Sequence, residues 1–332
     1  MMADDTLCND LLPEVSVIVL SYNQADTVAR ALDSILAQQC DFPFEIVVSD
    51  DASTDGTRAV INRYAARFPG VVRVMPEAPR RGLVDNYFYT LSQCRGRFIA
   101  DCAADDFWVN ERGLQLKRDR LVADPALSMV CSDWLSFSDD DSDEIRSLIA
   151  NNEDENRLHR FDGKGLLEDE LSKAGSALVH LSTALYRRSF IDDALATTPA
   201  LVHDAAMGCE DLPVKAALMS RGDVEWISTV TLCYRVGHAS VSAPENPSNL
   251  LRFQLQTAAA VARLADHYGV PRSKVAENLK DKIGYAIAVA FAARDYKGVK
   301  EADALRRQLH LILGIKSRVR IMLARIAARR DK

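Results

Sequence analysis

The chain has 332 residues, of which 48% are hydrophobic and 27% are charged. This composition is enough for a large core, in one large domain or in one domain with an appendage, and it excludes a chain that is disordered throughout. The net charge of −6 gives no support for binding nucleic acid through bulk charge, so we expect no nucleic-acid partner.

The N-terminal segment, residues 1–12, is predicted to be an acidic tail. It lacks a basic region followed by an apolar stretch, so we do not expect a secretory signal. The seven cysteines form no C-x-x-C pair, which suits a reducing compartment. No apolar run reaches the roughly 20 residues that cross a bilayer. We therefore expect a cytoplasmic protein, either free or peripheral on the inner face of the membrane.

Short apolar runs alternate with helical patterns between residues 15 and 135. The predicted strands are 15–20, 44–51, 71–76, 97–102 and 127–134, and the predicted helices are 27–38, 57–68, 84–94 and 111–124. This alternation predicts an α/β fold with a mainly parallel sheet that carries helices on both faces. In such sheets ligands bind outside the carboxyl ends of the strands.

The middle of the chain departs from this alternation. Residues 139–157 contain eight acidic residues, and we expect a solvated loop there, with a lid near the substrate as the alternative. Strand-like sequence returns at 177–190 and 224–236, with a helical pattern at 213–222 between them. We therefore predict one domain over residues 13–242.

Residues 243–332 are predicted to form a helical region with no strand. Its end, residues 315–332, has seven Lys or Arg residues against one acid, a local charge of +6 that leaves −12 for the remainder. A basic amphipathic end of this kind suits contact with an anionic membrane surface. A basic helix docked on the acidic domain and a soluble tail are the alternatives.

The common phosphate, zinc and nucleophile motifs are absent from the sequence, which has no G-x-G-x-x-G after the first strand, no P-loop, no zinc spacing and no G-x-S-x-G. What remains is a set of acidic strand ends, including DCAADDFW at 101–108. Clustered carboxylates suit Mg²⁺ or Mn²⁺, which in turn bind phosphates. Adjacent residues on an extended chain point to opposite sides, so Asp105 and Asp106 need different roles.

Three segments, taken in order, resemble the family 2 glycosyltransferases of the GT-A fold. They are VSVIVLSYNQADTVARALDSILAQ, FEIVVSDDASTDGT and RRGLVDNYFYTLSQCRGRFIADCAADDFW. The resemblance covers about residues 14–135, and 175–242 more loosely. It implies a Rossmann-like nucleotide-diphospho-sugar transferase fold. It also implies metal-dependent transfer of a sugar to an acceptor hydroxyl, with inversion.

The resemblance also implies a donor site. By analogy with the family, Tyr22 lies near the nucleotide base, with core packing as the alternative. Asp51 binds the edge of the base with Asp50 beside it, or the pair merely caps a turn. Gly82 and Asn86 match the loop glycine and the asparagine that lie near the nucleotide.

The same analogy implies a metal site for Mg²⁺ or Mn²⁺. Asp106 is expected to ligate the ion that bridges the two phosphates, while Asp105 faces the ribose or the donor sugar. Arg235 is expected near the phosphates. His238 is expected near the metal or the diphosphate, with an ordinary loop or core histidine as the alternative.

The segment GCEDLPVKAALMSRG resembles the part of the family that supplies the catalytic base. It makes Asp211 the expected base, with Glu210 as its neighbour, although Asp211 can also cap a helix before Pro213. Asp101 suits either an extra ligand or a paired core carboxylate. Trp108 and its neighbour Phe107 suit either packing or a wall for the acceptor.

We therefore expect an inverting glycosyltransferase that uses a nucleotide-diphosphate sugar and acts in bacterial cell-surface polysaccharide or glycan synthesis. The expected acceptor is a glycan or a lipid-linked glycan. A nucleotidyltransferase is the alternative enzyme, but it favours a Gly-rich, basic loop after its first strand, which SYNQADT lacks. A non-catalytic protein that binds sugar nucleotides on the same fold is the third hypothesis.

Overall fold

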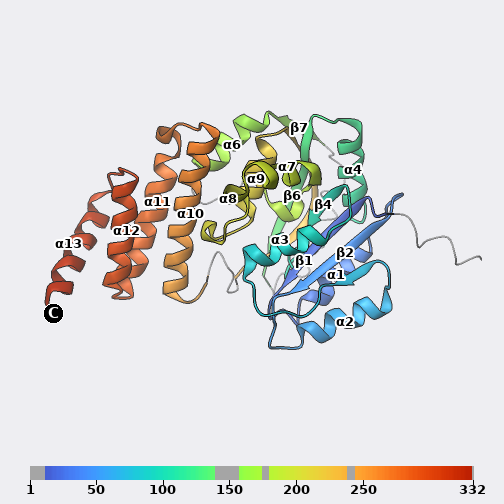
Figure 1. The fold of residues 1–332 in the computed structure, drawn as a ribbon, viewed down its shortest axis with the longest axis horizontal. Coiled ribbons are helices and arrows are strands. Elements are labelled where there is room, and N and C mark those ends of the chain that lie inside the picture. The colour runs from blue at the N-terminus through green and yellow to red at the C-terminus, as the bar shows by residue number, and fades with distance from the viewer. Residues whose placement is uncertain (1–11, 139–156, 174–178, 238–243, 331–332) are drawn as a thin grey trace, which may run out of the picture. The chain divides into compact units, whose positions relative to one another are not determined.

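The computed structural model describes residues 12–138, 157–173, 179–237 and 244–330 (Figure 1). The chain divides into two compact units. The first contains residues 1–164, 179–203 and 217–236, and the second contains residues 165–178, 204–216 and 237–332. The second unit thus includes residues 165–178, 204–216 and 237–242 of the predicted 13–242 domain. Most of the predicted acidic loop, 139–156, lies outside the described residues.

The first unit is built on one central sheet. Its strands are β1 (Val15–Ser21), β2 (Phe44–Asp50), β3 (Val72–Val74), β4 (Phe98–Asp101), β5 (Phe107–Trp108), β6 (Leu127–Phe137), β7 (Leu158–Phe161), β8 (Leu185–Arg187) and β9 (Asp223–Arg235). They lie in the order β3-β2-β1-β4-β8-β6-β9-β5, and β7 pairs with β9. The predicted α/β fold with a central sheet is confirmed.

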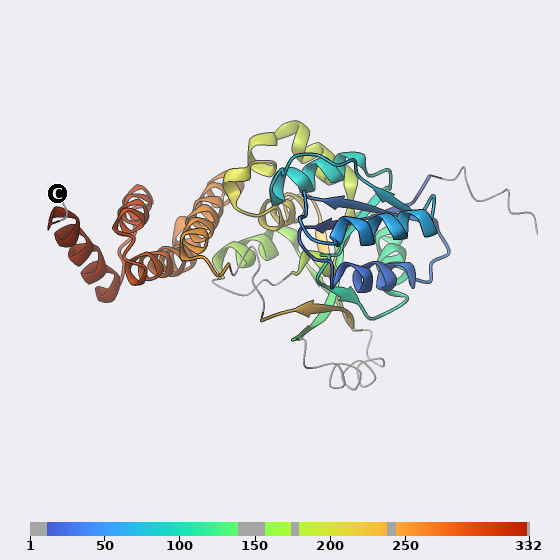
Figure 2. The same ribbon diagram turned by 90° about the horizontal axis from the view of Figure 1, so that it is seen from below.

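One half of the sheet, β3-β2-β1-β4, is parallel throughout. Apolar residues dominate these strands because helices cover both faces, although Glu45 interrupts β2 and Arg73 interrupts β3. In Figure 1, α1 (Val28–Leu36) and α2 (Thr57–Arg67) lie below β1 and β2, whereas α3 (Leu83–Gln93) lies above them. Figure 2 looks at the same strands from the side of α1 and α2.

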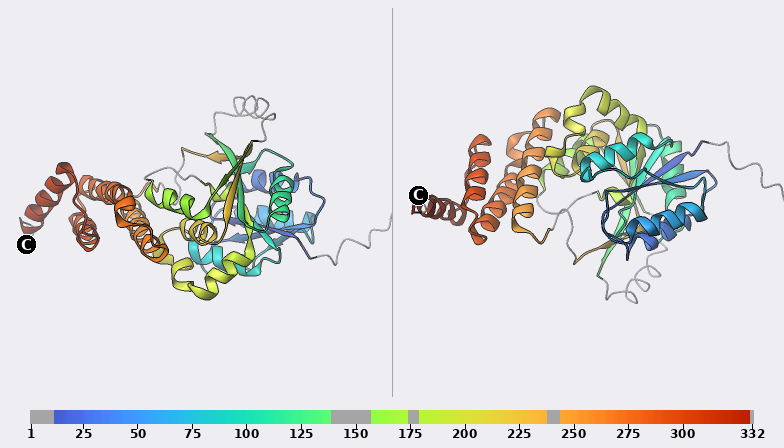
Figure 3. Two further views of the ribbon diagram at one scale, coloured as in Figure 1. Left: turned by 90° about the horizontal axis from the view of Figure 1, so that it is seen from above. Right: turned by 60° about the horizontal axis from the view of Figure 1, so that its bottom comes forward.

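The other half of the sheet is mixed. The short strand β8 pairs antiparallel with both β4 and β6. Strands β6 and β9 run parallel and side by side (Figure 3), with shifts of register near Asp133. Strands β5 and β7 add to β9 in the antiparallel direction. The alternation of strands and helices predicts a mainly parallel sheet. The half that contains β1, β2, β3 and β4 has this parallel arrangement, whereas the other half is mixed.

Further helices complete the first unit and form most of the second. They are α4 (Gly113–Ala123), α6 (Gly163–Ser172), α7 (Arg188–Thr197), α8 (Pro199–Val202), α9 (Asp211–Met219), α10 (Pro247–Tyr268), α11 (Arg272–Ala292), α12 (Tyr296–Gln308) and α13 (Ile315–Arg330), with short 3₁₀ turns at Leu181–Thr183 and Ala205–Met207. The predicted strand-like segment 177–190 contains β8 and the start of α7. Among the described residues, no helix is long and apolar enough to cross a bilayer.

Candidate active site

The acidic segments follow the carboxyl ends of adjacent parallel strands. Ser21 of β1 lies opposite Asp50 of β2, and Ile18 of β1 lies opposite Asp101 of β4. The backbone N–H of Cys102 donates to the Ile18 carbonyl, which keeps the chain beside β1 as it leaves β4. The polar segments SYN, SDDASTDG and DCAADDFW, which begin at the ends of β1, β2 and β4, therefore emerge at one edge of the sheet.

Asp51 organises the loop that leads into α3. Its carboxylate accepts the backbone N–H of Arg81 at Oδ1 (2.7 Å) and that of Gly82 at Oδ2 (3.0 Å). The Nε of Arg80 lies 3.6 Å from Oδ2. Asp51 is 6% exposed, so these contacts compensate the charge of a carboxylate that is largely removed from water. The structure thereby brings Asp51 and Gly82, two predicted donor-site residues, into direct contact.

Gly82 is required at its position by its backbone conformation. Its φ of 84° and ψ of 161° fall in a region that only glycine adopts readily. A Cβ built there would have no atom within 4 Å, so crowding does not explain the glycine. A side chain at this position would strain the turn that presents two N–H groups to Asp51.

Asp50 holds the turn on the other side of the same strand end. Its Oδ2 accepts the backbone N–H of Ser53 at 3.3 Å, and its Oδ1 accepts the hydroxyls of Ser53 and Ser21. Ala52 has a φ of 62°, a left-handed conformation that this bonded turn must maintain. Asp50 therefore shapes the turn on which Asp51 stands, as its capping interpretation predicts.

Tyr22 is 37% exposed and is not a core residue. The guanidinium of Arg80 lies over its ring, 3.7 Å from the centroid, in a cation–π contact. The same arginine lies near Asp51, so it connects the two predicted base contacts. Sequence reasoning missed Arg80, although the Arg80-Arg81-Gly82 run immediately before α3 was a signal of charge at this loop.

Asn86 lies in the core between α3 and β2. It is 1% exposed, and its side-chain oxygen accepts the Ser49 hydroxyl at 2.7 Å. Its described contact therefore ties the helix to the sheet. A role near the nucleotide stays a prediction for this residue.

Asp105 and Asp106 lie in the turn between β4 and β5. The Asp106 backbone N–H donates to the Ala103 carbonyl, which closes this turn. Asp106 is 1% exposed, and its Oδ1 accepts the backbone N–H of Arg235 at 2.9 Å. Asp105 is only partly buried. The structure therefore joins the DD turn to the end of β9, where two of the predicted phosphate-site residues meet.

Asp101 pairs with core tyrosines. The hydroxyl of Tyr186 is hydrogen-bonded to both Asp101 and Tyr87. Burial, together with the charge of Asp101, raises the pKa of Tyr186 well above its ordinary value, so its hydroxyl keeps its proton. Asp101 thus has the contacts of a paired core carboxylate.

Phe107 and Trp108 take part in packing. Trp108 is 8% exposed and belongs to the main core cluster. Phe107 packs edge-on against Phe137, with the Arg30 guanidinium 4.1 Å from its ring centroid. These contacts follow the packing interpretation of the two aromatic residues.

The DD turn fits the donor set of a divalent metal. Within the described part of the chain, no three His, Cys, Asp or Glu side chains cluster closely enough to hold an ion. Magnesium sites commonly take one or two carboxylates and complete their shell with substrate phosphates and water. Asp105 and Asp106 suit that arrangement, since they offer two carboxylates on one turn at the edge of the sheet.

The predicted base belongs to the second unit. Asp211 is partly exposed and begins α9, where a negative charge interacts favourably with the helix dipole. Glu210 immediately precedes the helix, and its carbonyl accepts the N–H of Val214. Of the remaining predicted residues, His238 lies outside the described part of the chain.

A buried ion pair stands one helical turn after Asp211, and sequence reasoning missed it. Lys215 Nζ donates to Glu170 Oε1 at 2.6 Å, and both side chains are 5% exposed. Burial alone would lower the pKa of Lys215, but the carboxylates of Glu170 and Asp211 raise it above its ordinary value. The i, i+4 spacing from Asp211 was the available signal for Lys215, whereas nothing local pointed to Glu170.

A mixed α/β sheet with acidic turns at the ends of its central strands suits an enzyme that binds a phosphorylated ligand through a divalent metal. Residues 16–194, more than half of the chain, match the family model described as glycosyl transferase family 2. The chain belongs to this family. The resemblance that the sequence motifs indicate is confirmed.

Two relatives match this chain over less than half of its length. The succinoglycan biosynthesis protein ExoO of Rhizobium meliloti is 34% identical over 137 residues, 41% of this chain and 37% of its own length. A Mycobacterium tuberculosis protein, Rv1520, is 40% identical over 96 residues, 29% of this chain and 28% of its own. The match therefore spans well under half the length of these relatives.

Solved glycosyltransferases share the fold at low identity. TarS 1–349 of S. aureus, solved with UDP-GlcNAc, gives a TM-score of 0.61 at 18% identity and covers 94% of this chain and 89% of that chain. The mannosyltransferase PcManGT of Pyrobaculum calidifontis, solved with GDP-Man and Mn²⁺, gives 0.52 at 21% identity, covering 96% and 81%. Both similarities extend beyond the residues that match the family model.

Proposed function

We propose that this protein is an inverting glycosyltransferase that moves a sugar from a nucleotide-diphosphate donor to an acceptor hydroxyl. The observation that carries the proposal is the meeting of three polar strand ends at one edge of the sheet, with Asp51 and the Asp105–Asp106 turn among them. Family membership favours glycosyl transfer over nucleotidyl transfer as the activity of this site.

The donor nucleotide is proposed to bind between the β1 and β2 strand ends. Tyr22 offers an exposed ring for stacking with the base, and Asp51 offers a carboxylate for the edge of the base. Gly82 keeps the backbone in close approach to this position, with Asp50 shaping the turn beside it and Asn86 supporting the start of α3.

The diphosphate is proposed to lie at the DD turn with Mg²⁺ or Mn²⁺. Asp106 is the proposed metal ligand, and Asp105 is proposed to face the ribose or the sugar. When bound, the ion would offset the charge that builds on the leaving phosphate. Arg235 is proposed to contact the phosphates, and His238 the metal or the diphosphate. The Mn²⁺ in the PcManGT complex supports this choice of cofactor.

The base is proposed to be Asp211, with Glu210 as its neighbour. The carboxylate takes the proton of the acceptor hydroxyl as that oxygen attacks the anomeric carbon. The bond from this carbon to the diphosphate oxygen breaks, and the nucleoside diphosphate leaves with the electron pair. A single displacement inverts the anomeric configuration.

The acceptor is proposed to be a glycan or a lipid-linked glycan in bacterial cell-surface polysaccharide synthesis. ExoO, named for succinoglycan biosynthesis, supports this class of acceptor. We expect the reaction to take place in the cytoplasm or at the inner face of the membrane.

Calorimetric titration tests the donor site. UDP, GDP and dTDP are titrated into the full chain with and without Mn²⁺, and into Asp106→Asn under the same conditions. We expect one nucleotide to bind with a strong dependence on metal, and Asp106→Asn to remove that dependence. If no nucleotide binds to the wild-type protein and Mn²⁺ has no effect, the proposal is wrong.

A further inference from the structure

Helix α13 has a stripe of apolar side chains on its exposed side. Ile315, Val319, Met322 and Ile326 follow one another at intervals of four, three and four residues, so they share one face of the helix. Their exposed fractions are 77%, 42%, 54% and 44%. Leu323, at the margin of this face, is 44% exposed. We call these five residues the α13 stripe.

The other side of α13 is packed within the second unit. Ile321 and Ala324 are 7% and 1% exposed. Arg325 donates to the carboxylate of Asp303, on α12, at 2.7 Å. A Cβ added to Gly284 of α11 would lie 3.5 Å from the Ser317 hydroxyl. Because the inner face already packs the helix against the rest of the second unit, the α13 stripe does not contribute to the core of that unit.

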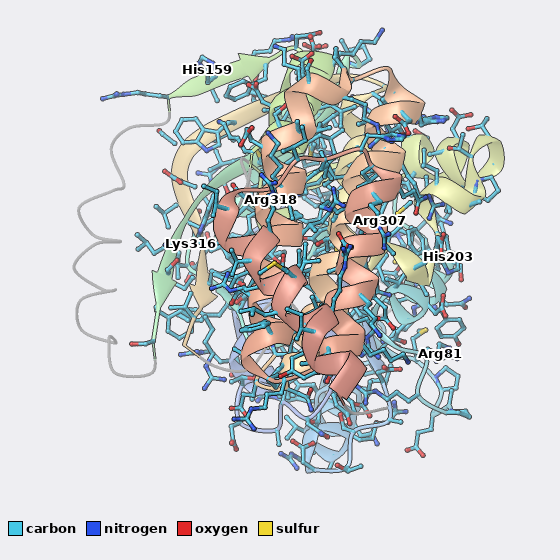
Figure 4. All side chains as sticks on the ribbon, turned by 90° about the vertical axis from the view of Figure 1, so that its left-hand side faces the viewer. Arg81, His159, His203, Arg307, Lys316 and Arg318 are labelled. Atoms are coloured by element: carbon cyan, nitrogen blue, oxygen red, sulfur yellow. The ribbon has the colours of Figure 1, made fainter. Side chains whose placement is uncertain are left out.

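Positive charges border the α13 stripe on both sides. At 100° per residue, exposed Lys316 falls on one flank of the stripe, and Arg318 and Arg325 fall on the other. The sequence contains no Asp or Glu between Asp303 and Asp331. Figure 4 labels Lys316 and Arg318 on this helix. It also labels Arg307 on α12, and the Arg307 side chain is 60% exposed.

An apolar centre with cationic margins complements the surface of an anionic bilayer. The apolar side chains reach the boundary between head groups and acyl chains, while Lys and Arg remain with the phosphates. A second copy of the chain would bring like charges from both helices together, which disfavours that occupant. The remaining residues carry −12 against +6 for residues 315–332, so an anionic surface favours contact through this end.

We propose that α13 binds an anionic lipid bilayer lying flat, with the α13 stripe inserted at the level of the acyl boundary and Lys316 and Arg318 at the head groups. This interaction goes beyond the proposed transfer reaction and does not depend on it. It assigns the membrane contact expected from the sequence to one face of α13.

Co-sedimentation of the full chain with lipid vesicles tests the proposal. One set of vesicles contains phosphatidylcholine and phosphatidylglycerol in equal parts, and the other contains phosphatidylcholine alone. We expect binding to the anionic vesicles that weakens as salt is added, and little binding to the neutral ones. Equal or absent binding to the two kinds of vesicle overturns the proposal.

Two double variants separate the apolar and the electrostatic contributions. Lys316→Gln with Arg318→Gln removes two charges and is expected to lower the partition constant by about thirtyfold. Val319→Ser with Met322→Ser is expected to lower it by about tenfold or more. Val122→Ser, at a residue that is 46% exposed on α4, and Arg63→Gln, at an exposed residue on α2, are the matched controls.

The controls are expected to bind anionic vesicles like the wild type. Circular dichroism checks that every variant is folded, and nucleotide titration without vesicles reports the donor site independently. If both double variants bind as tightly as the wild type, the α13 stripe is not the contact. Light scattering tests whether a second copy covers the stripe instead. The lipid proposal is overturned if the wild type is a dimer that does not bind vesicles and that Val319→Ser with Met322→Ser dissociates.

Discussion

Asp105 and Asp106 are adjacent in the chain, but the fold surrounds them differently. Asp106 is 1% exposed and accepts the backbone N–H of Arg235, whereas Asp105 remains partly exposed. A buried carboxylate that holds a backbone group also supports the turn itself, because its loss leaves a buried donor without its acceptor. The two residues should therefore respond differently to the same chemical change.

The matched pair Asp105→Asn and Asp106→Asn tests this difference. We expect Asp106→Asn to remove the Mn²⁺ dependence of nucleotide binding, and Asp106→Ala, which leaves the Arg235 N–H without its acceptor, to lower the melting temperature as well. Asp105→Asn should keep the metal dependence and weaken binding of the complete sugar nucleotide more than that of the free nucleotide. Calorimetric titration and thermal unfolding measure both effects. The reverse pattern would exchange the proposed roles of the two residues.

Lys117 is a buried lysine that the proposed chemistry does not use. It is 4% exposed, and its Nζ donates to the Thr231 hydroxyl at 2.9 Å. Burial lowers its pKa from 10.5 to about 7. Between these two values the unfolded chain binds a proton that the folded chain does not, so the free energy of unfolding rises with pH in this window.

Lys117→Met is expected to flatten this dependence. In the wild type the group should add about 2 kcal/mol to the free energy of unfolding between pH 7 and pH 9, and the variant should lack that gain. Urea unfolding at a series of pH values measures it. Lys297→Met, at a side chain that is 88% exposed, is the control and should keep the wild-type slope. A wild-type slope in Lys117→Met would contradict the argument.

At the scale of elements, α6 and α9 are joined by the Lys215–Glu170 pair. Both side chains are 5% exposed, so water does little to compensate either charge. The pair lies one turn from Asp211 and thereby helps to define the start of α9. Removing one partner leaves the other charge buried, which costs far more than removing both.

Lys215→Met is therefore expected to lower the free energy of unfolding by about 3–5 kcal/mol. The double variant Lys215→Met with Glu170→Met should recover most of this loss, because it leaves no buried charge behind. Denaturant unfolding of the wild type, both single variants and the double variant gives the coupling energy. Additive losses in the double variant would show that the pair does not act as a unit.

At the scale of the whole molecule, the proposed donor residues and the proposed base belong to different compact units. Tyr22, Asp51 and Asp106 lie in the first unit, and Asp211 lies in the second. Binding of the donor and transfer of the sugar should therefore be separable by mutation.

Asp211→Asn is expected to leave the Kd of the nucleotide within about twofold and to reduce kcat by about 10²–10⁴-fold, as befits the loss of a general base. Titration gives the first quantity, and release of nucleoside diphosphate in the presence of acceptor gives the second. Glu210→Gln serves as the neighbouring control, with a smaller loss of kcat. An Asp211→Asn variant that turns over like the wild type would remove this residue from the mechanism.

The alternation of strands and helices could be predicted because both signals are local. Apolar runs at 17–20 and 46–48 mark β1 and β2, and the helical spacing of Val28, Ala31 and Ile35 marks α1. Such patterns reflect burial on both faces of a strand or on one face of a helix, and each needs only a few neighbouring residues. The carboxylates at the ends of β2 and β4 could also be placed at one edge. Both strands run parallel to β1, and parallel neighbours end at the same edge of a sheet.

The sequence by itself thus determined the α/β class, the acidic strand ends and the family. Only the tertiary structure decided contacts between distant residues, such as Asp101 with Tyr186 and Lys215 with Glu170. It also decided which face of α13 remains uncovered, because periodicity marks an apolar face but not whether a partner lies against it. These features depend on which elements meet in space, and no local pattern in the chain encodes that meeting.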